Sequence, residues 1–285
     1  MLNLAQRNLK IFFRQKSAVF FSLLGVFVII GLYVVFLGDV WSDNFKDLSE
    51  INTLMNNWIM AGIVSVTAIT TTMGSFGIMV EDNVQKNSKD FYASPIKRSK
   101  IVGGYVLSSY LIGLLMSILA FILGEAYIVF SGGELLPLLA MLKILGIILL
   151  SVMMSSSLVF FIVSFFSSSS AFATASTIIG TLVGFLTGIY LPIGALPDGV
   201  QWAIKLFPVS HAGALIRQVM MENPMATSFA GIPQNYLTDF QNMMGVTYTY
   251  GTFTATATTH ILVLIGTTVV FLGLALINVS RKPSF

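Results

Sequence analysis

Long apolar runs alternate with short polar segments along the chain. Six of these runs reach the roughly 20 residues that a helix needs to cross a bilayer, at about 17–38, 57–80, 101–124, 141–166, 171–191 and 258–280. Helices are the expected form, because lipid offers no partner for unpaired backbone groups and the runs are too long for barrel strands. The pattern therefore predicts an all-α integral membrane protein, with residues 1–285 forming one transmembrane domain.

The segment before the first run, residues 1–16, has two distinct faces when drawn as a helix. Leu2, Ala5, Leu9, Phe12 and Phe13 share one stripe, and the opposite face carries Arg7, Lys10 and Arg14. Such a helix suits the headgroup layer, with its cations toward anionic lipid. The alternative is a frayed basic tail.

Charge is scarce and unevenly placed. Only 9% of residues are charged, against about 25% in an ordinary globular domain. With a cytoplasmic N-terminus, the inner segments hold most of the 15 basic residues, namely Arg7, Lys10, Arg14, Lys16, Lys86, Lys89, Lys97, Arg98, Lys100, Arg281 and Lys282. Basic residues favour the cytoplasmic side, so both termini are expected in the cytoplasm of a bacterial cell. The net charge of +3 then reflects membrane topology and not nucleic-acid binding.

Residues 81–100 form a conspicuously polar segment between the second and third runs. As a helix, this segment would place Val84, Asn87 and Phe91 on one face for a soluble partner. Phe91 and Tyr92 are the expected anchors, since buried aromatics usually dominate interface energy. Pro95 should end the helix, because its ring prevents the continuing hydrogen bond. The alternative is a solvated charged loop.

The fifth run has a small residue at every fourth position. These residues, which let another helix approach closely, are Ser176, Gly180, Gly184 and Gly188. The spacing fits packing within one subunit and an interface between two subunits about equally well.

Residues 192–222 are apolar but broken by prolines, so their pieces are too short to cross. They are expected to enter the outer leaflet and return, which is tolerable where protein covers the backbone. Residues 223–257 are polar and are expected to form an outer loop with little regular structure.

Two degenerate motifs resemble those of type-2 ABC exporter permeases, which are the transmembrane subunits of drug, lipid and polysaccharide exporters. The first is an acid ending span two, a coupling helix and a Ser-Pro turn into span three, here Glu81, Asp90-Phe91, Ser94-Pro95-Ile96 and Arg98. The second is the broken outer segment, here Pro192, Leu196-Pro197, Trp202, Phe207-Pro208, His211 and Arg217. Residues 223–257 depart from the pattern by being longer than in many relatives.

The resemblance implies ATP-driven export of a hydrophobic or amphiphilic compound such as a drug, antimicrobial peptide or lipid, with polysaccharide as a variant. It implies a cytoplasmic ATPase dimer that binds ATP and magnesium, and a second permease subunit, identical or homologous. No G-x-x-x-x-G-K-[ST] sequence occurs here, which agrees with an ATPase on another chain.

Few residues suggest chemistry within this chain. Glu125 is a candidate acid in the membrane, although it lies about 36 Å along the helix from Ile101, near the expected outer headgroups. The polar residues close to His260 in the sequence are all threonines, and the chain has no cysteine. No catalytic or metal constellation is predicted. The rival function is an ATP-independent secondary transporter or channel, which would need buried ionisable residues along its spans.

Overall fold

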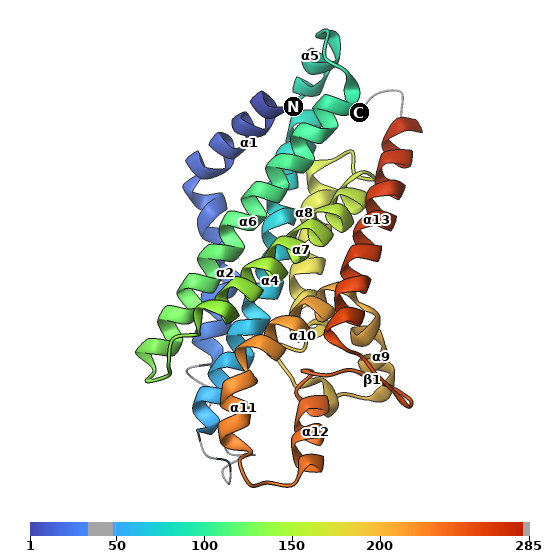
Figure 1. The fold of residues 1–285 in the computed structure, drawn as a ribbon. Coiled ribbons are helices and arrows are strands. Elements are labelled where there is room, and N and C mark those ends of the chain that lie inside the picture. The colour runs from blue at the N-terminus through green and yellow to red at the C-terminus, as the bar shows by residue number, and fades with distance from the viewer. Residues whose placement is uncertain (34–47, 49, 282–285) are drawn as a thin grey trace.

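The computed structural model describes residues 1–33, 48 and 50–281, and they are almost entirely helical (Figure 1). In chain order the elements are α1 (Leu2–Arg14), α2 (Lys16–Leu32), α4 (Ile51–Val84), α5 (Asn87–Ala93), α6 (Arg98–Phe130), α7 (Leu138–Val163), α8 (Ser169–Leu186), η2 (Ile193–Ala195), α9 (Asp198–Leu206), α10 (Pro208–Met220), α11 (Glu222–Ser228), α12 (Gln234–Met243), β1 (Thr249–Tyr250), β2 (Phe253–Thr254) and α13 (Ala257–Arg281).

Five of these helices, α4, α6, α7, α8 and α13, are long and apolar enough to cross a membrane. They correspond to the second to sixth predicted spans, and α4 and α6 extend several residues beyond the predicted limits at both ends. The first predicted span, 17–38, coincides with α2 as far as Leu32, and residues 34–38 lie outside the described part. The all-α membrane fold is confirmed, and the first of the six predicted crossings stays a prediction.

Helix α4 lies at the centre, where it packs against α2, α6, α7, α8 and α10. Its hydroxyl groups are buried but paired, because a threonine in a helix can donate to the carbonyl four residues earlier. Thr67 and Thr71 both do so, and Ser75 donates to the Ser109 hydroxyl of α6 at 2.7 Å. Close approach continues at Gly113, where a Cβ would lie 2.7 Å from the Thr72 methyl group.

The bundle has two different ends (Figure 1). Helices α1 and α5 and the last turn of α13 gather at one end, and α9, α11, α12 and the β-hairpin gather at the other. The predicted topology requires this grouping, since it assigns the polar segment 81–100 and the termini to one side.

Residues 223–257 are more regular than the sequence predicted. They contain most of α11, all of α12 and the antiparallel pair β1–β2, with Gly251 at φ +63° in the turn between the strands. The expectation of little regular structure was wrong. Helix α12 is polar and contributes a single buried aromatic, Phe240, whose ring centroid lies 5.2 Å from that of Phe229. One aromatic anchor leaves too weak a periodic pattern to predict a helix.

Candidate functional site

The polar segment 81–100 contains a short helix held between two long ones. Helix α4 ends at Val84, and Lys86 turns the chain with a left-handed φ of 65° before α5 begins. The Ser94 hydroxyl donates to the Phe91 carbonyl, and Pro95 lies between this residue and the start of α6 at Arg98. The predicted helix, its end before Pro95 and the entry into the next span are confirmed.

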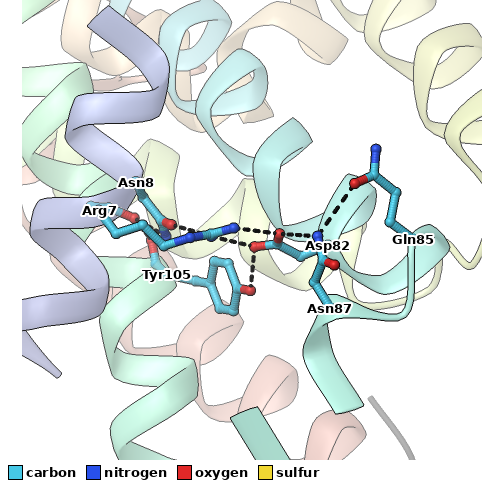
Figure 2. A network of polar contacts seen from close by, with 7 residues as sticks. Arg7, Asn8, Asp82, Gln85, Asn87 and Tyr105 are labelled. Atoms are coloured by element: carbon cyan, nitrogen blue, oxygen red, sulfur yellow. Dashed lines mark hydrogen bonds and ion pairs between the residues drawn. The ribbon is translucent and has the colours of Figure 1, made fainter. Parts of the chain in front are cut away.

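The base of this segment is fixed by a carboxylate that the sequence analysis did not single out, that of Asp82. Two nitrogens of Arg7 donate to its two oxygens at 2.6 and 2.8 Å. The Tyr105 hydroxyl donates to it at 2.7 Å, and the Asn87 amide at 3.3 Å. Figure 2 shows these groups converging from α1, α4, α5 and α6. We call Arg7, Asp82, Asn87 and Tyr105 the Asp82 cluster.

Arg7 and Asp82, which form the ion pair in this cluster, are unequally buried. The Asp82 side chain is 6% exposed, and that of Arg7 is 35% exposed. The hydrogen bonds to Asp82 raise the pKa of the Arg7 guanidinium above its ordinary value. Such a bidentate pair fixes orientation as well as charge. The cluster therefore ties the N-terminal helix to the start of α5.

Helix α1 buries Ala5 and Phe12 of its predicted apolar stripe, but one residue of the predicted basic face turns inward. The helix packs mainly on α6, where the buried Asn8 amide donates to the Ser108 hydroxyl at 3.1 Å. Leu2 is 71% exposed, and Arg7 turns inward to Asp82. The expectation that Arg7 faces lipid headgroups was wrong, since a buried carboxylate on α4 offers it a stronger partner.

Glu81, the acid that the resemblance assigned to the end of span two, is exposed. Its oxygens accept from the Gln85 amide at 2.6 Å and from the Ser169 hydroxyl at the start of α8 at 3.0 Å. The adjacent Asp82 is the one that faces the core. A signal for this was present in the sequence, because Asp82 follows Ser75 and Met79 on the packed face of α4.

Val84, Asn87 and Phe91 do not share one helix as predicted, because α4 ends at Val84 and the other two lie on α5. Asn87 turns toward Asp82, and the Phe91 ring is half-buried under the Arg7 guanidinium at 5.4 Å, within the range of a cation–π contact. Val84 is 43% exposed, and Asp90 is exposed on α5. Arg98, at the start of α6, is exposed, and the side chain of Tyr92 lies outside the described side chains. Their contact with a partner stays a prediction.

A cavity of about 800 Å³ lies beside the Asp82 cluster, between α1 and the end of α4. Its lining mixes charged and apolar groups, including Arg14 and Phe12 of α1 and Gly74 and Gly77 of α4. It can accept a molecule that is apolar in one part and polar in another.

The small residues of the fifth run divide into two pairs. A Cβ at Gly184 would overlap the Tyr190 ring. A Cβ at Gly188, which has a φ of +66°, would lie 2.6 Å from the Ile193 side chain, so both glycines pack within this chain. Gly180 has nothing within 4 Å of its Cβ position. The Ser176 hydroxyl donates to its own helix. Within the described residues, the half of α8 around Gly180 faces open space.

The prolines of the outer segment mark element boundaries as predicted. Pro192 precedes η2, Pro197 precedes α9, and Pro208 is the first residue of α10, where a missing N–H costs nothing. Trp202 on α9 is 51% exposed, and its ring centroid lies 5.7 Å from that of Tyr250 on the hairpin.

His211 and His260 form a buried pair that the sequence analysis missed, with their Nδ1 atoms 2.7 Å apart. The Nε2 atom of His211 lies 2.9 Å from the Lys205 carbonyl, which can only accept, so this nitrogen carries the proton. In the neutral pair, His211 Nδ1 then accepts from His260 Nδ1–H. Burial lowers the pKa of His211 below its ordinary value. The pair joins α10 to the start of α13.

Arg217 is also fully buried but has different neighbours. Its guanidinium lies 4.9 Å from the Trp58 ring centroid, and it donates to the Gly188 carbonyl at 3.1 Å. Burial lowers the pKa of Arg217 to about 10. His211 and Arg217 therefore do not form one site, and Arg217 joins α10 to α4 and to the end of the fifth run. Among the described residues, no group of three His, Cys, Asp or Glu side chains could hold a metal ion.

Glu125, near the end of α6, is 5% exposed. One of its oxygens accepts from the Leu136 N–H at 3.2 Å, and the other has no partner among the described residues. The carboxyl is thus covered by protein, and its predicted place near the outer headgroups stays a prediction.

Comparison with known proteins gives one family. The model of the ABC-2 family transporter protein matches residues 39–277, which is most of the chain and includes α4 to α12, the hairpin and nearly all of α13. No curated protein matches the sequence. The resemblance inferred from the two motifs is confirmed, and the chain belongs to the ABC-2 family of transporter proteins.

Proposed function

We propose that this chain is the permease subunit of an ATP-driven exporter that moves a hydrophobic or amphiphilic compound outward, with α5 receiving force from a separate ATPase. The observation that carries the proposal is the Asp82 cluster, which joins α5 to α1, α4 and α6 at one end of the bundle.

The family supplies the division of labour. The ABC-2 membrane domain lacks the ATPase, so this chain is a non-catalytic transmembrane subunit, and ABC-2 permeases generally pair with ATPase subunits. In the proposed exporter an ATPase dimer in the cytoplasm binds ATP and magnesium, and this chain provides the path through the membrane.

Force transfer from α5 follows from its connections. Asn87 in its first turn donates to Asp82 on α4, and Asp82 also holds Arg7 on α1 and Tyr105 on α6. A displacement of α5 would therefore act on three helices at once and would not be absorbed by a flexible loop. The half-buried Phe91 ring under Arg7 adds a second connection to α1.

The topology proposed for this exporter is a cell-membrane protein with six spans and both termini in the cytoplasm, as the basic residues favour. Helices α9 and α10 would then lie at the outer leaflet as a re-entrant pair. The shared location of α1, α5 and the end of α13 supports this assignment (Figure 1).

A second permease subunit would complete the path. The open face of α8 around Gly180 and Ser176 supports an interface there, because a neighbouring helix can approach small residues closely. The 800 Å³ cavity beside the Asp82 cluster, with its mixed lining, supports an amphiphilic cargo entering from the α5 end.

The test is reconstitution of the tagged chain with the ATPase that co-purifies with it. We expect the chain to stimulate ATP hydrolysis and to export an amphiphilic dye only when ATP is present. Dye movement driven by an ion gradient without ATP would support a secondary transporter instead. Export of polysaccharide but not dye would retain the mechanism and replace the cargo.

A further inference from the structure

The corner between α6 and α7 contains a buried acid that the proposed coupling does not use. Glu125 is 5% exposed, and one oxygen holds the Leu136 backbone N–H at 3.2 Å. The other oxygen, Oε1, has no hydrogen-bond partner among the described residues. A buried carboxylate oxygen without a donor is costly, so it indicates a missing partner.

Glu125 is one of the residues that line a groove of about 660 Å³. Apart from Glu125 its walls are apolar, and they come from α6, the following turn and α7, with Ile122, Val129, Leu135 and Met141 among them. None of the lining residues belongs to α8, so the groove is separate from the proposed subunit interface.

The groove lies on an exposed apolar surface. Apolar side chains around it are exposed on the molecule, including Phe130 at 92%, Leu138 at 73% and Leu135 at 60%. A surface of this kind is stable in the bilayer and not in water. A ligand would therefore enter from the membrane and would itself be apolar over most of its length.

We propose that this groove binds a lipophilic amine, with the alkyl chain along the apolar walls and the ammonium group hydrogen-bonded to Glu125 Oε1. A cationic donor satisfies both the open acceptor and the charge, and charge-assisted hydrogen bonds are the stronger kind. No lysine or arginine lines the groove, so the phosphate of an aminophospholipid would have no partner. The ligand class is thus a monocationic alkylamine and not a zwitterionic lipid.

The site does not rest on the proposed function, because binding requires no ATPase. Dodecylamine binding to the purified full chain in phosphatidylcholine nanodiscs is the direct measurement. Glu125→Gln keeps an oxygen that can accept from Leu136 but loses the charge, and it should weaken dodecylamine binding by about tenfold or more. Glu134→Gln, which removes an exposed acid in the adjacent turn, should bind like the wild type.

Further arms separate this ligand from others. Dodecanol has the same chain without the charge. It should bind the wild type more weakly than dodecylamine does, and the two ligands should bind Glu125→Gln equally. Ala126→Phe, which fills the groove and leaves the carboxyl intact, should reduce binding of both. Equal dodecylamine binding by the wild type and either groove variant would overturn the proposal. So would preferential displacement of dodecylamine by phosphatidylethanolamine, which would indicate a lipid site.

Discussion

Replacing Arg7 by Gln removes the cation that neutralises Asp82 and leaves a carboxylate that is only 6% exposed. Tyr105 and Asn87 would still donate to it, but both are neutral. Removing one partner of a buried pair costs about 3–5 kcal/mol. Because Arg7 is 35% exposed and two donors remain, we expect a lower cost of about 2 kcal/mol.

The reciprocal change should cost less. In Asp82→Asn the freed guanidinium can turn toward solvent, and the new amide still accepts one hydrogen bond, so the expected cost is about 1 kcal/mol. The double variant should then be more stable than Arg7→Gln alone, because no buried charge is left unpaired. This ordering is a sharper signature of the pair than either single value.

The assay is the temperature at which the detergent-purified chain loses its monodisperse size-exclusion peak. A cost of about 2 kcal/mol corresponds to a decrease of about 4–8 °C in a chain of this size. Lys10→Gln, an exposed cation on the same helix, is the matched control and should change little. The reasoning is refuted if Arg7→Gln behaves like Lys10→Gln, or if the double variant is the least stable of the set.

Three further predictions test other parts of the account. Gly184→Leu should lower the thermal midpoint by overlap with the Tyr190 ring, whereas Gly180→Leu should leave it unchanged and weaken association of two permease chains in a crosslinking assay. Because burial lowers the pKa of His211, the unfolded chain binds its proton more readily, so stability present above about pH 6.5 should be lost as the pH falls below that value. When thermal midpoints are measured over a pH series, His211→Gln should reduce the dependence of the midpoint on pH. An unchanged dependence would contradict this prediction. Phe91→Ala should lower ATP-dependent export or ATPase co-purification, and normal values of both would exclude its coupling role.

Much of the architecture could be predicted because lipid imposes a simple pattern. The five candidate spans, the short helix 87–93 and its end before Pro95 follow from run length and from proline's missing donor. Helix α12 could not be predicted in the same way, because its stability depends on the contact between Phe240 and the ring of Phe229, which follows α11.

The polar contacts within the bundle were the hardest to foresee. Asp82 and Arg7 are 75 residues apart, and His211 and His260 are 49 apart, so pairing depends on how the helices pack. The helical wheel assigned Arg7 to a lipid-facing side because it included no neighbouring protein helix. For Gly184 and Gly180 the sequence left two alternatives, and the structure assigns only Gly184 to packing within the chain.

The most direct test of the central claim is crosslinking from α5 to the ATPase. The chain has no cysteine, so Asp90→Cys on exposed α5 introduces a single thiol, and Tyr236→Cys on exposed α12 introduces one at the opposite end. A heterobifunctional reagent that reacts with the thiol is applied to inside-out vesicles and to intact cells. The account predicts a crosslinked ATPase adduct from position 90 and none from position 236. An adduct from position 236, or none from position 90 when the ATPase co-purifies, would contradict it.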